Sequence, residues 1–140
     1  MSDFKSALLT PQEVHTLWWK IEPQISKALK HSSGELSSFE IFKQAISSKI
    51  QVWITLENDT KIVCVTTTEI VVHATNRKEL HILTIGGTNI KRFLDQHKVL
   101  ESFAKTQGCK SIKTESRKGF DRLTNGNYKI KYYVYEKDLD

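Results

Sequence analysis

Two adjacent glycines, Gly86 and Gly87, stand where the sequence changes from a strand pattern to a helix pattern. The residues before them, 79–85, read ELHILTI, an apolar and β-branched run that is typical of a strand. The residues after them, 89–108, have apolar side chains at the three-and-four spacing of an amphipathic helix, with Gly108 as its C-cap. This junction predicts an α/β fold and raises the question of what the bare backbone accommodates.

The pattern of apolar residues changes once more, near Gln51, from helical to extended. Before that point, Thr10 as an N-cap and Pro11 in the first turn predict the start of a long helix. After it, a hairpin leads into the strand before the glycines, and a tyrosine-rich strand closes the chain. The predicted helical segments are 11–34, 37–49, 89–108 and part of 117–127, and the predicted strands are 51–57, 61–74, 79–85, 109–116 and 128–139.

The order ααβββαβαβ predicts one domain over residues 1–140, an α/β three-layer sandwich whose mixed, mainly antiparallel sheet is flanked by helices. Residues 1–49 supply the N-terminal helices, and residues 50–140 supply the sheet, the glycine loop with its helix, and the C-terminal strands. No apolar run approaches the length of a membrane span, and the N-terminus lacks the layout of a secretory signal. We therefore expect a cytoplasmic protein with no membrane partner.

Positive charge is concentrated in the second half of the chain. The net charge is +5, of which residues 1–70 contribute −1 and residues 71–140 contribute +6. Clustered lysine and arginine suit a polyanionic partner, either nucleic acid or a phosphorylated cofactor. A basic surface that is merely solvated is an equal alternative.

The glycine junction is also a candidate anion site. A helix that starts there would present the unpaired backbone amides of Thr88, Asn89, Ile90 and Lys91, and the helix dipole favours an anion beside them. The side chains of Lys91 and Arg92 add positive charge. The alternative is a simple turn, since glycine adopts positive φ without steric cost.

With these elements in place, the chain resembles the GNAT superfamily of N-acetyltransferases, and within it the small divergent members found in tailed-phage genomes. The resemblance runs from about residue 19 to residue 139. It rests on the strand KIVCVTTTEIVVHA, the central strand ELHILTI, the loop GGTN and the helix IKRFLDQHKVLESFAKTQGC. Gly126 and Tyr128 approximate the family's glycine-aromatic step near the C-terminus. In this interpretation the family's first strand has no counterpart before the N-terminal helix.

The resemblance implies that the protein transfers an acetyl group from acetyl-CoA to an unidentified amine. It implies that residues 109–116 splay away from the central strand and open a slot for the pantetheine arm. A Gly87→Glu substitution would then remove cofactor binding without unfolding the protein. The residues that the resemblance assigns to cofactor binding are Ile85, Gly86, Gly87, Thr88, Asn89, Lys91 and Arg92.

Three side chains are candidates for proton transfer. Glu69 is the only carboxylate in strand 61–74, and a carboxylate in an apolar setting holds a proton more tightly. His81 belongs to the residue type whose charge changes near neutral pH. Tyr128 lies where the family sometimes places a tyrosine acid. The alternatives are a solvated strand residue for Glu69, a sheet-surface histidine for His81 and strand packing for Tyr128.

We expect no metal site, because His73 and His81 lie on separate predicted strands without an evident third ligand. Cys64 and Cys109 lack the spacing of a zinc or redox motif, so we expect buried free thiols.

Two other functions remain open. The first is a non-catalytic module of the same fold that binds nucleic acid or another protein, for example in a virion, through its basic C-terminal half. The second is a homodimer in which the strand of residues 128–139 pairs across a two-fold axis, which is compatible with either activity.

Overall fold

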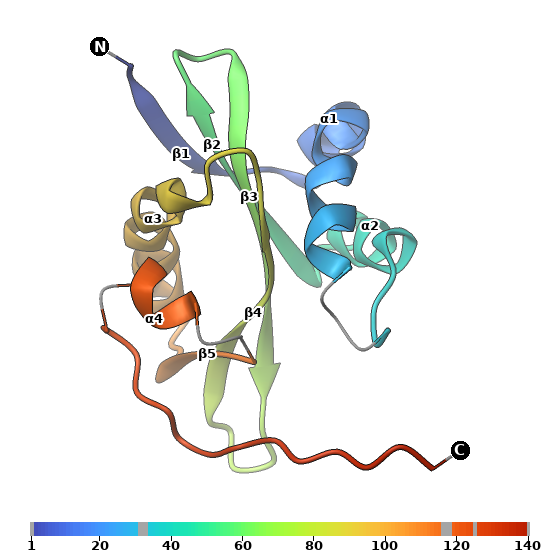
Figure 1. The fold of residues 1–140 in the computed structure, drawn as a ribbon, viewed down its shortest axis with the longest axis vertical. Coiled ribbons are helices and arrows are strands. Elements are labelled where there is room, and N and C mark those ends of the chain that lie inside the picture. Colours follow the sequence, from blue (N-terminus) through green and yellow to red (C-terminus); the bar gives the residue numbers. More distant parts are fainter. Residues whose placement is uncertain (1, 31–33, 116–118, 125, 140) are drawn as a thin grey trace.

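The computed structural model describes residues 2–30, 34–115, 119–124 and 126–139 of the chain. A single sheet separates two layers of helices, as the sequence predicts (Figure 1). None of the described helices is long and apolar enough to span a bilayer. The helices are α1 (Pro11–Leu29), α2 (Ser38–Ile46), η1 (Ile90–Arg92, a 3₁₀ turn), α3 (Phe93–Thr106) and α4 (Gly119–Leu123). The strands are β1 (Phe4–Leu8), β2 (Ile50–Glu57), β3 (Lys61–Val72), β4 (Lys78–Gly86) and β5 (Ser111–Thr114).

The five strands lie in the order β1-β2-β3-β4-β5, and only the β4–β5 pair is parallel. The predicted mixed, mainly antiparallel sheet is therefore confirmed. β1 is a correction, because the sequence pattern predicts no strand before the first helix. Residues 4–8 pair with residues 53–57 of β2, and this pairing fixes the strand. Two of its five residues are partly buried and three are exposed, so its sequence carries little apolar alternation that could have revealed it.

The start of α1 is confirmed at Thr10. The Thr10 hydroxyl accepts a hydrogen bond from the backbone amide of Glu13 at 3.1 Å, and the Glu13 carboxylate accepts one from the Thr10 amide at 2.8 Å. Pro11 occupies the first helical position, where no amide hydrogen is needed. This reciprocal capping sets the point at which the chain leaves β1 and turns over the sheet.

Each face of the sheet has its own apolar core. The helices α1 and α2 pack on one face, and α3 packs on the other (Figure 1). Because strand side chains alternate between faces, the core membership of each residue also tells which face its neighbours occupy. The α1/α2 core contains Val14, Ile21, Ile25, Ile41, Val52, Ile54 and Val65, among others. The α3 core contains Trp53, Cys64, Leu80, Ile82, Phe93, Leu100 and Ala104.

A buried glutamine joins α3 to the sheet. The side chain of Gln96 is fully buried, and its amide nitrogen donates to the Cys64 carbonyl oxygen at 2.9 Å. Its amide oxygen accepts from the Thr66 hydroxyl at 2.5 Å. The two bonds fix how far along the sheet the helix lies, and therefore where its first turn stands relative to β4.

A Gln96→Leu substitution is expected to lower the free energy of unfolding by about 2 kcal/mol. Leucine fills a similar volume but leaves the Cys64 carbonyl and the Thr66 hydroxyl buried without a partner. Urea denaturation measures the loss. The control is Gln107→Leu, at the exposed C-cap of the same helix, for which we expect a change within about 0.5 kcal/mol. Equal effects of the two substitutions would contradict the role assigned to Gln96.

The predicted strand 128–139 is wrong. Residues 126–139 form neither helix nor strand, and β5 has no described strand on its outer edge. The alternating side chains therefore have no ladder to join, and Ile130, Tyr133 and Tyr135 are 66%, 71% and 89% exposed. The segment passes around the β5 edge and across the hairpin end of β4 (Figure 1).

The short elements before this segment agree in part with the prediction. β5 covers residues 111–114 of the predicted strand 109–116, and α4 covers residues 119–123 of the predicted helical turn. Residues 116–118 and 125 lie outside the described part of the chain.

Candidate active site

β4 contains one extra residue at its centre. Thr67 of β3 lies opposite Thr84, while the next residue, Thr68, lies opposite Ile82. Leu83 is therefore the extra residue of a β-bulge. A bulge bends its strand and removes one residue from the regular ladder, so β4 changes direction at this point.

β5 accompanies β4 only as far as the bulge. It pairs with residues 79–82, and the Thr114 hydroxyl donates to the Ile82 carbonyl at 3.1 Å at the end of the ladder. From Leu83 to Gly86, β4 has no described strand on its β5 side. This arrangement is the one expected if residues 109–116 separate from the central strand.

The two glycines at the end of β4 are required by close backbone contacts. A Cβ atom on Gly86 would lie 2.3 Å from the carbonyl oxygen of Gln24 in α1. A Cβ atom on Gly87 would lie 2.2 Å from the carbonyl oxygen of Val63 in β3, and Gly87 has φ of +156°. The bare backbone therefore lets the strand end pack directly on a helix and a strand. The expectation that Gly87→Glu leaves the fold intact is wrong for the same reason.

The backbone amides after the glycines are only partly free. The Asn89 amide donates to the Val63 carbonyl at 3.0 Å, so it is not available to an anion. The amides of Thr88, Ile90 and Lys91 have no hydrogen-bond partner among the described residues. The chain enters α3 through one 3₁₀ turn, so these three amides stand at the beginning of a helical segment.

The two positive side chains of this loop differ. Lys91 is exposed. The guanidinium carbon of Arg92 lies 3.7 Å from the ring centroid of Phe4, and its Nη1 lies 3.4 Å from an oxygen of Asp95. Arg92 is thus held against β1, and its role as an anion ligand is weaker than expected. A lysine from α1 also contacts this loop, since the Lys27 ammonium donates to the Gly87 carbonyl at 3.2 Å.

Glu69 and His81 lie directly opposite each other in the β3–β4 ladder. His81 is flanked by Leu80 and Ile82, both in the α3 core, so its side chain is on the α1/α2 face. Opposite residues of an antiparallel pair have Cβ atoms about 5 Å apart. The structure therefore brings together two of the three candidate catalytic side chains.

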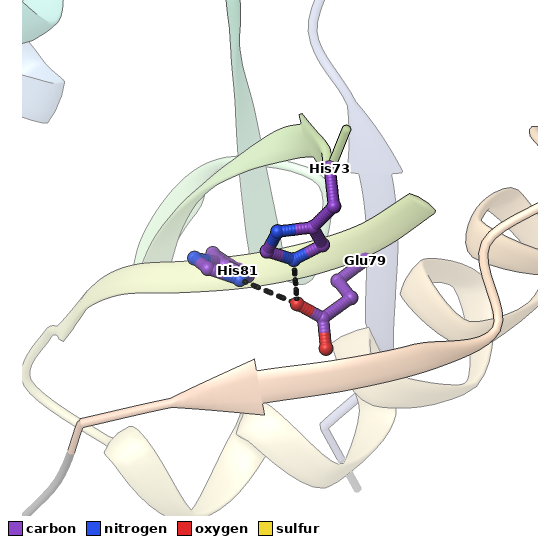
Figure 2. A group of neighbouring side chains, drawn as sticks. All are labelled: His73, Glu79 and His81. Atoms are coloured by element: carbon purple, nitrogen blue, oxygen red, sulfur yellow. Dashed lines mark hydrogen bonds and ion pairs between the residues drawn. The ribbon is translucent and has the colours of Figure 1, made fainter. Parts of the chain in front are cut away.

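Glu79 is a buried acidic residue beside His81, with 5% of its side chain exposed (Figure 2). Its Oε1 lies 2.5 Å from Nε2 of His73 and 3.5 Å from Nε2 of His81. The Ser111 hydroxyl donates to Oε2 at 3.2 Å. These partners, the His73 hydrogen bond above all, lower the pKa of Glu79 to about 2 although burial opposes the charged form.

Two cations complete the surroundings of Glu79. The ammonium of Lys113 lies 3.9 Å from Oε1, and the guanidinium nitrogen Nε of Arg77 lies 3.9 Å from Oε2. The Lys113 ammonium also lies 4.9 Å from the ring centroid of Tyr132, so the C-terminal segment lies beside the groups around Glu79. Two histidines, a serine hydroxyl and two cations therefore surround the buried Glu79 carboxylate.

Tyr128 lies apart from the other two candidates. Its hydroxyl is 2.6 Å from Nε2 of His97 on α3, and its ring packs edge-on against Phe120 of α4. Burial raises the pKa of Tyr128 and lowers that of His97. Since α3 and α4 cover the face opposite Glu69 and His81, the sheet separates Tyr128 from them. A groove of about 800 Å³ between α3 and β5 reaches Tyr128 but not Glu69 or His81.

The cysteines are free, as the sequence predicts, but only Cys64 is fully buried. Burial raises the pKa of the Cys64 thiol to about 12, so it is unreactive in the folded protein. Cys109 is only half-buried, and burial raises its pKa as well.

No protein-family model matches the sequence, and no curated protein matches it. Solved structures do match. An aminoglycoside acetyltransferase from an uncultured soil metagenomic sample, in complex with sisomicin, has a TM-score of 0.69 at 13% identity, over 98% of this chain and 97% of that chain. A ribosomal-protein-alanine N-acetyltransferase from Brucella melitensis biovar Abortus 2308 has a TM-score of 0.67 at 10% identity, over 99% and 100%. A GNAT family acetyltransferase from Staphylococcus aureus subsp. aureus has a TM-score of 0.63 at 15% identity, over 99% and 100%.

This chain has the GNAT fold. The likeness extends over nearly the whole length of each chain, so it includes both helical layers and the sheet between them. At 10–15% identity it establishes the architecture and leaves the acceptor to be found from the residues of this chain.

Sequence reasoning missed Glu79 and His73 as parts of the site in this GNAT fold. The signal that could have found them is the register of the β3–β4 hairpin. Val71 lies opposite Glu79, and the His73 amide donates to the Arg77 carbonyl at 2.9 Å, so the next residue of that face follows at His73. Residues 69, 71 and 73 therefore share a face with residues 79 and 81.

Proposed function

We propose that the protein is an acetyl-CoA-dependent N-acetyltransferase that acts on an amine. The observation that carries the proposal is the GNAT fold with a bulged β4 whose second half has no described strand on its β5 side. Two of the neighbours are named for different acceptors, an aminoglycoside and a ribosomal-protein alanine, so the fold alone does not choose the acceptor.

The residues at the start of α3 fit the pyrophosphate of acetyl-CoA. Three amides without a partner among the described residues, those of Thr88, Ile90 and Lys91, stand there with the exposed Lys91 side chain. Gly86 and Gly87 let the strand end pack on α1 and β3 just before these amides. The Asn89 amide contributes nothing to this site because it is bonded to β3.

Acetyl-CoA, when bound, supplies the acetyl group as a thioester. We assign His81 as the general base that takes a proton from the acceptor ammonium, with Glu69 opposite it to stabilise the imidazolium that results. Leu83, which the bulge removes from the ladder, offers the candidate backbone amide for the thioester carbonyl oxygen. Tyr128 has no role in this scheme, because it lies on the other side of the sheet.

Acetyl-CoA and CoA are expected to raise the melting temperature of the protein, and ATP is not. A ligand at about a hundred times its Kd stabilises the folded state by about 2.7 kcal/mol, which raises Tm by roughly 5–10 °C in a chain of this size. A thermal-shift titration with the three ligands in parallel measures this. An equal response to all three would point to unspecific phosphate binding instead.

A charge reversal at the loop locates the binding site. Lys91→Glu is expected to abolish the shift with acetyl-CoA, whereas Lys105→Glu, in the last turn of α3, leaves it unchanged. If Lys91→Glu retained the full shift, the loop would not be the cofactor site. A panel of amines with detection of released thiol in the Cys109→Ser variant then identifies the acceptor, because Cys64 is buried while the protein stays folded.

A non-catalytic module of the same fold is the second candidate. Two of the expected anion ligands are already engaged, the Asn89 amide with Val63 and Arg92 with Phe4 and Asp95. If no ligand raises Tm, the basic half of the chain should be tested against nucleic acid, whose binding weakens steeply with added salt. The exposed aromatic side chains of residues 132–135 offer a surface for a second copy in either case.

A further inference from the structure

Three side chains at the hairpin end of β4 form a group of metal-ligand type. His73, Glu79 and His81 each offer one ligand atom, and these atoms lie within 4.8 Å of one another (Figure 2). Glu79 and His81 come from β4, and His73 follows the end of β3. Two imidazoles and one carboxylate are the ligand set with which proteins hold zinc where a fourth position stays open.

One separation within the group already matches that of a tetrahedral ion, and the others must adjust. Ligand atoms at about 2.1 Å from zinc lie about 3.4 Å apart. The distance from His81 Nε2 to Glu79 Oε1 is already 3.5 Å. The distance from His73 Nε2 to the same oxygen is 2.5 Å and must open by about 0.9 Å. The His73 side chain is 43% exposed and stands just after the strand end, so a small rotation achieves this.

Two cations compete with a metal for Glu79. Lys113 and Arg77 each lie 3.9 Å from one of its oxygens. Their side chains are 31% and 46% exposed, so both can turn toward solvent when an ion enters. Because the Lys113 ammonium competes with the ion for Glu79, removal of the Lys113 charge should strengthen metal binding.

We propose that His73, Glu79 and His81 bind a divalent transition-metal ion of the zinc type, with a solvent molecule as the fourth ligand. The expectation of no metal rested on the lack of a third ligand, and Glu79 supplies that ligand. Metal binding uses the lone pair of His81 Nε2. If His81 is the base of the proposed transfer, the ion therefore inhibits it, and this consequence alone rests on the proposed function.

The test is a calorimetric titration of the metal-free protein with ZnCl₂, together with the visible absorption of added Co²⁺. We expect one ion per chain, with His73→Gln and His81→Gln each weakening the affinity at least tenfold. His15→Gln, on the exposed surface of α1, should change nothing. Lys113→Met should tighten binding severalfold. Cys109→Ser should retain the full stoichiometry, which excludes the half-buried thiol as the ligand.

Two results would overturn the site. One is no heat and no Co²⁺ spectrum in either the wild-type protein or Lys113→Met, in which case the group is a hydrogen-bonded network around Glu79. The other is equal affinity in the wild-type, His73→Gln and His81→Gln proteins. Circular dichroism of each variant without metal checks that it is folded. If one histidine variant does not fold, the affinities of the other histidine variant and of Lys113→Met decide whether the site exists. The readouts do not depend on acetyl transfer, so they separate this site from the proposed activity.

Discussion

Replacing Gly86 with alanine is expected to lower the free energy of unfolding by about 3 kcal/mol. The added Cβ would lie 2.3 Å from the Gln24 carbonyl oxygen, and this is a backbone atom that cannot rotate away. Helix α1 would have to move off the sheet, and with it the apolar contacts of Ile21 and Ile25. Urea denaturation of the wild type and the variant measures the loss, and Tm should fall by roughly 10 °C.

Gly108 provides the matched control for this substitution. Gly108 has φ of +80°, and no atom lies within 4 Å of the position that a Cβ would occupy there, so Gly108→Ala tests conformational strain without a steric contact. Alanine in the left-handed region costs about 1–2 kcal/mol. If Gly86→Ala cost no more than Gly108→Ala, the strand end would not be tightly packed on α1.

A His81→Gln substitution is expected to lower kcat about a hundredfold, with an acceptor found from the amine panel. Glutamine preserves a polar side chain at the position but cannot take a proton from the acceptor. The thermal shift with acetyl-CoA should remain, since the loop at the start of α3 is unchanged. The comparison of rate and shift therefore separates proton transfer from cofactor binding.

Two further variants make the assignment of His81 specific. His15→Gln, exposed on α1, should leave the rate unchanged. Glu69→Gln should lower the rate, and the double variant of Glu69 and His81 should be little worse than His81→Gln alone, because residues that act as a unit are not additive. Full activity in His81→Gln would assign the proton transfer to another group.

The central part of the fold was predictable because its signals are local. The capped helix at Thr10, the β2–β3 hairpin and the strand-to-helix junction at Gly86 all depend on neighbouring residues, and the structure confirms them. The two ends of the chain were not predictable in this way. β1 exists because β2 pairs with it, although its own pattern is weak. Residues 128–139 have a clear strand pattern but no described strand to pair with.

The same distinction applies to the site: contacts set by local register were predictable, and contacts between distant segments were not. The opposition of Glu69 and His81 follows from a hairpin register, so residues chosen from sequence do meet in the structure. The meaning of the glycine pair could not be read from sequence, because it depends on the carbonyl oxygens of Gln24 and Val63, which are distant along the chain. The Glu79 group was missed because its buried carboxylate is surrounded only once β3, β4 and β5 are assembled.

The contacts of the glycine loop have a mechanical consequence. Gly86 lies against the Gln24 carbonyl, and the Lys27 ammonium donates to the Gly87 carbonyl at 3.2 Å, so two successive loop residues are fastened to the same helix. The Asn89 amide fastens the loop to β3 as well. A displacement of the loop is therefore transmitted to α1, which lies over the face that carries Glu69 and His81. The loop at the start of α3 and the face that carries Glu69 and His81 are thus connected through α1.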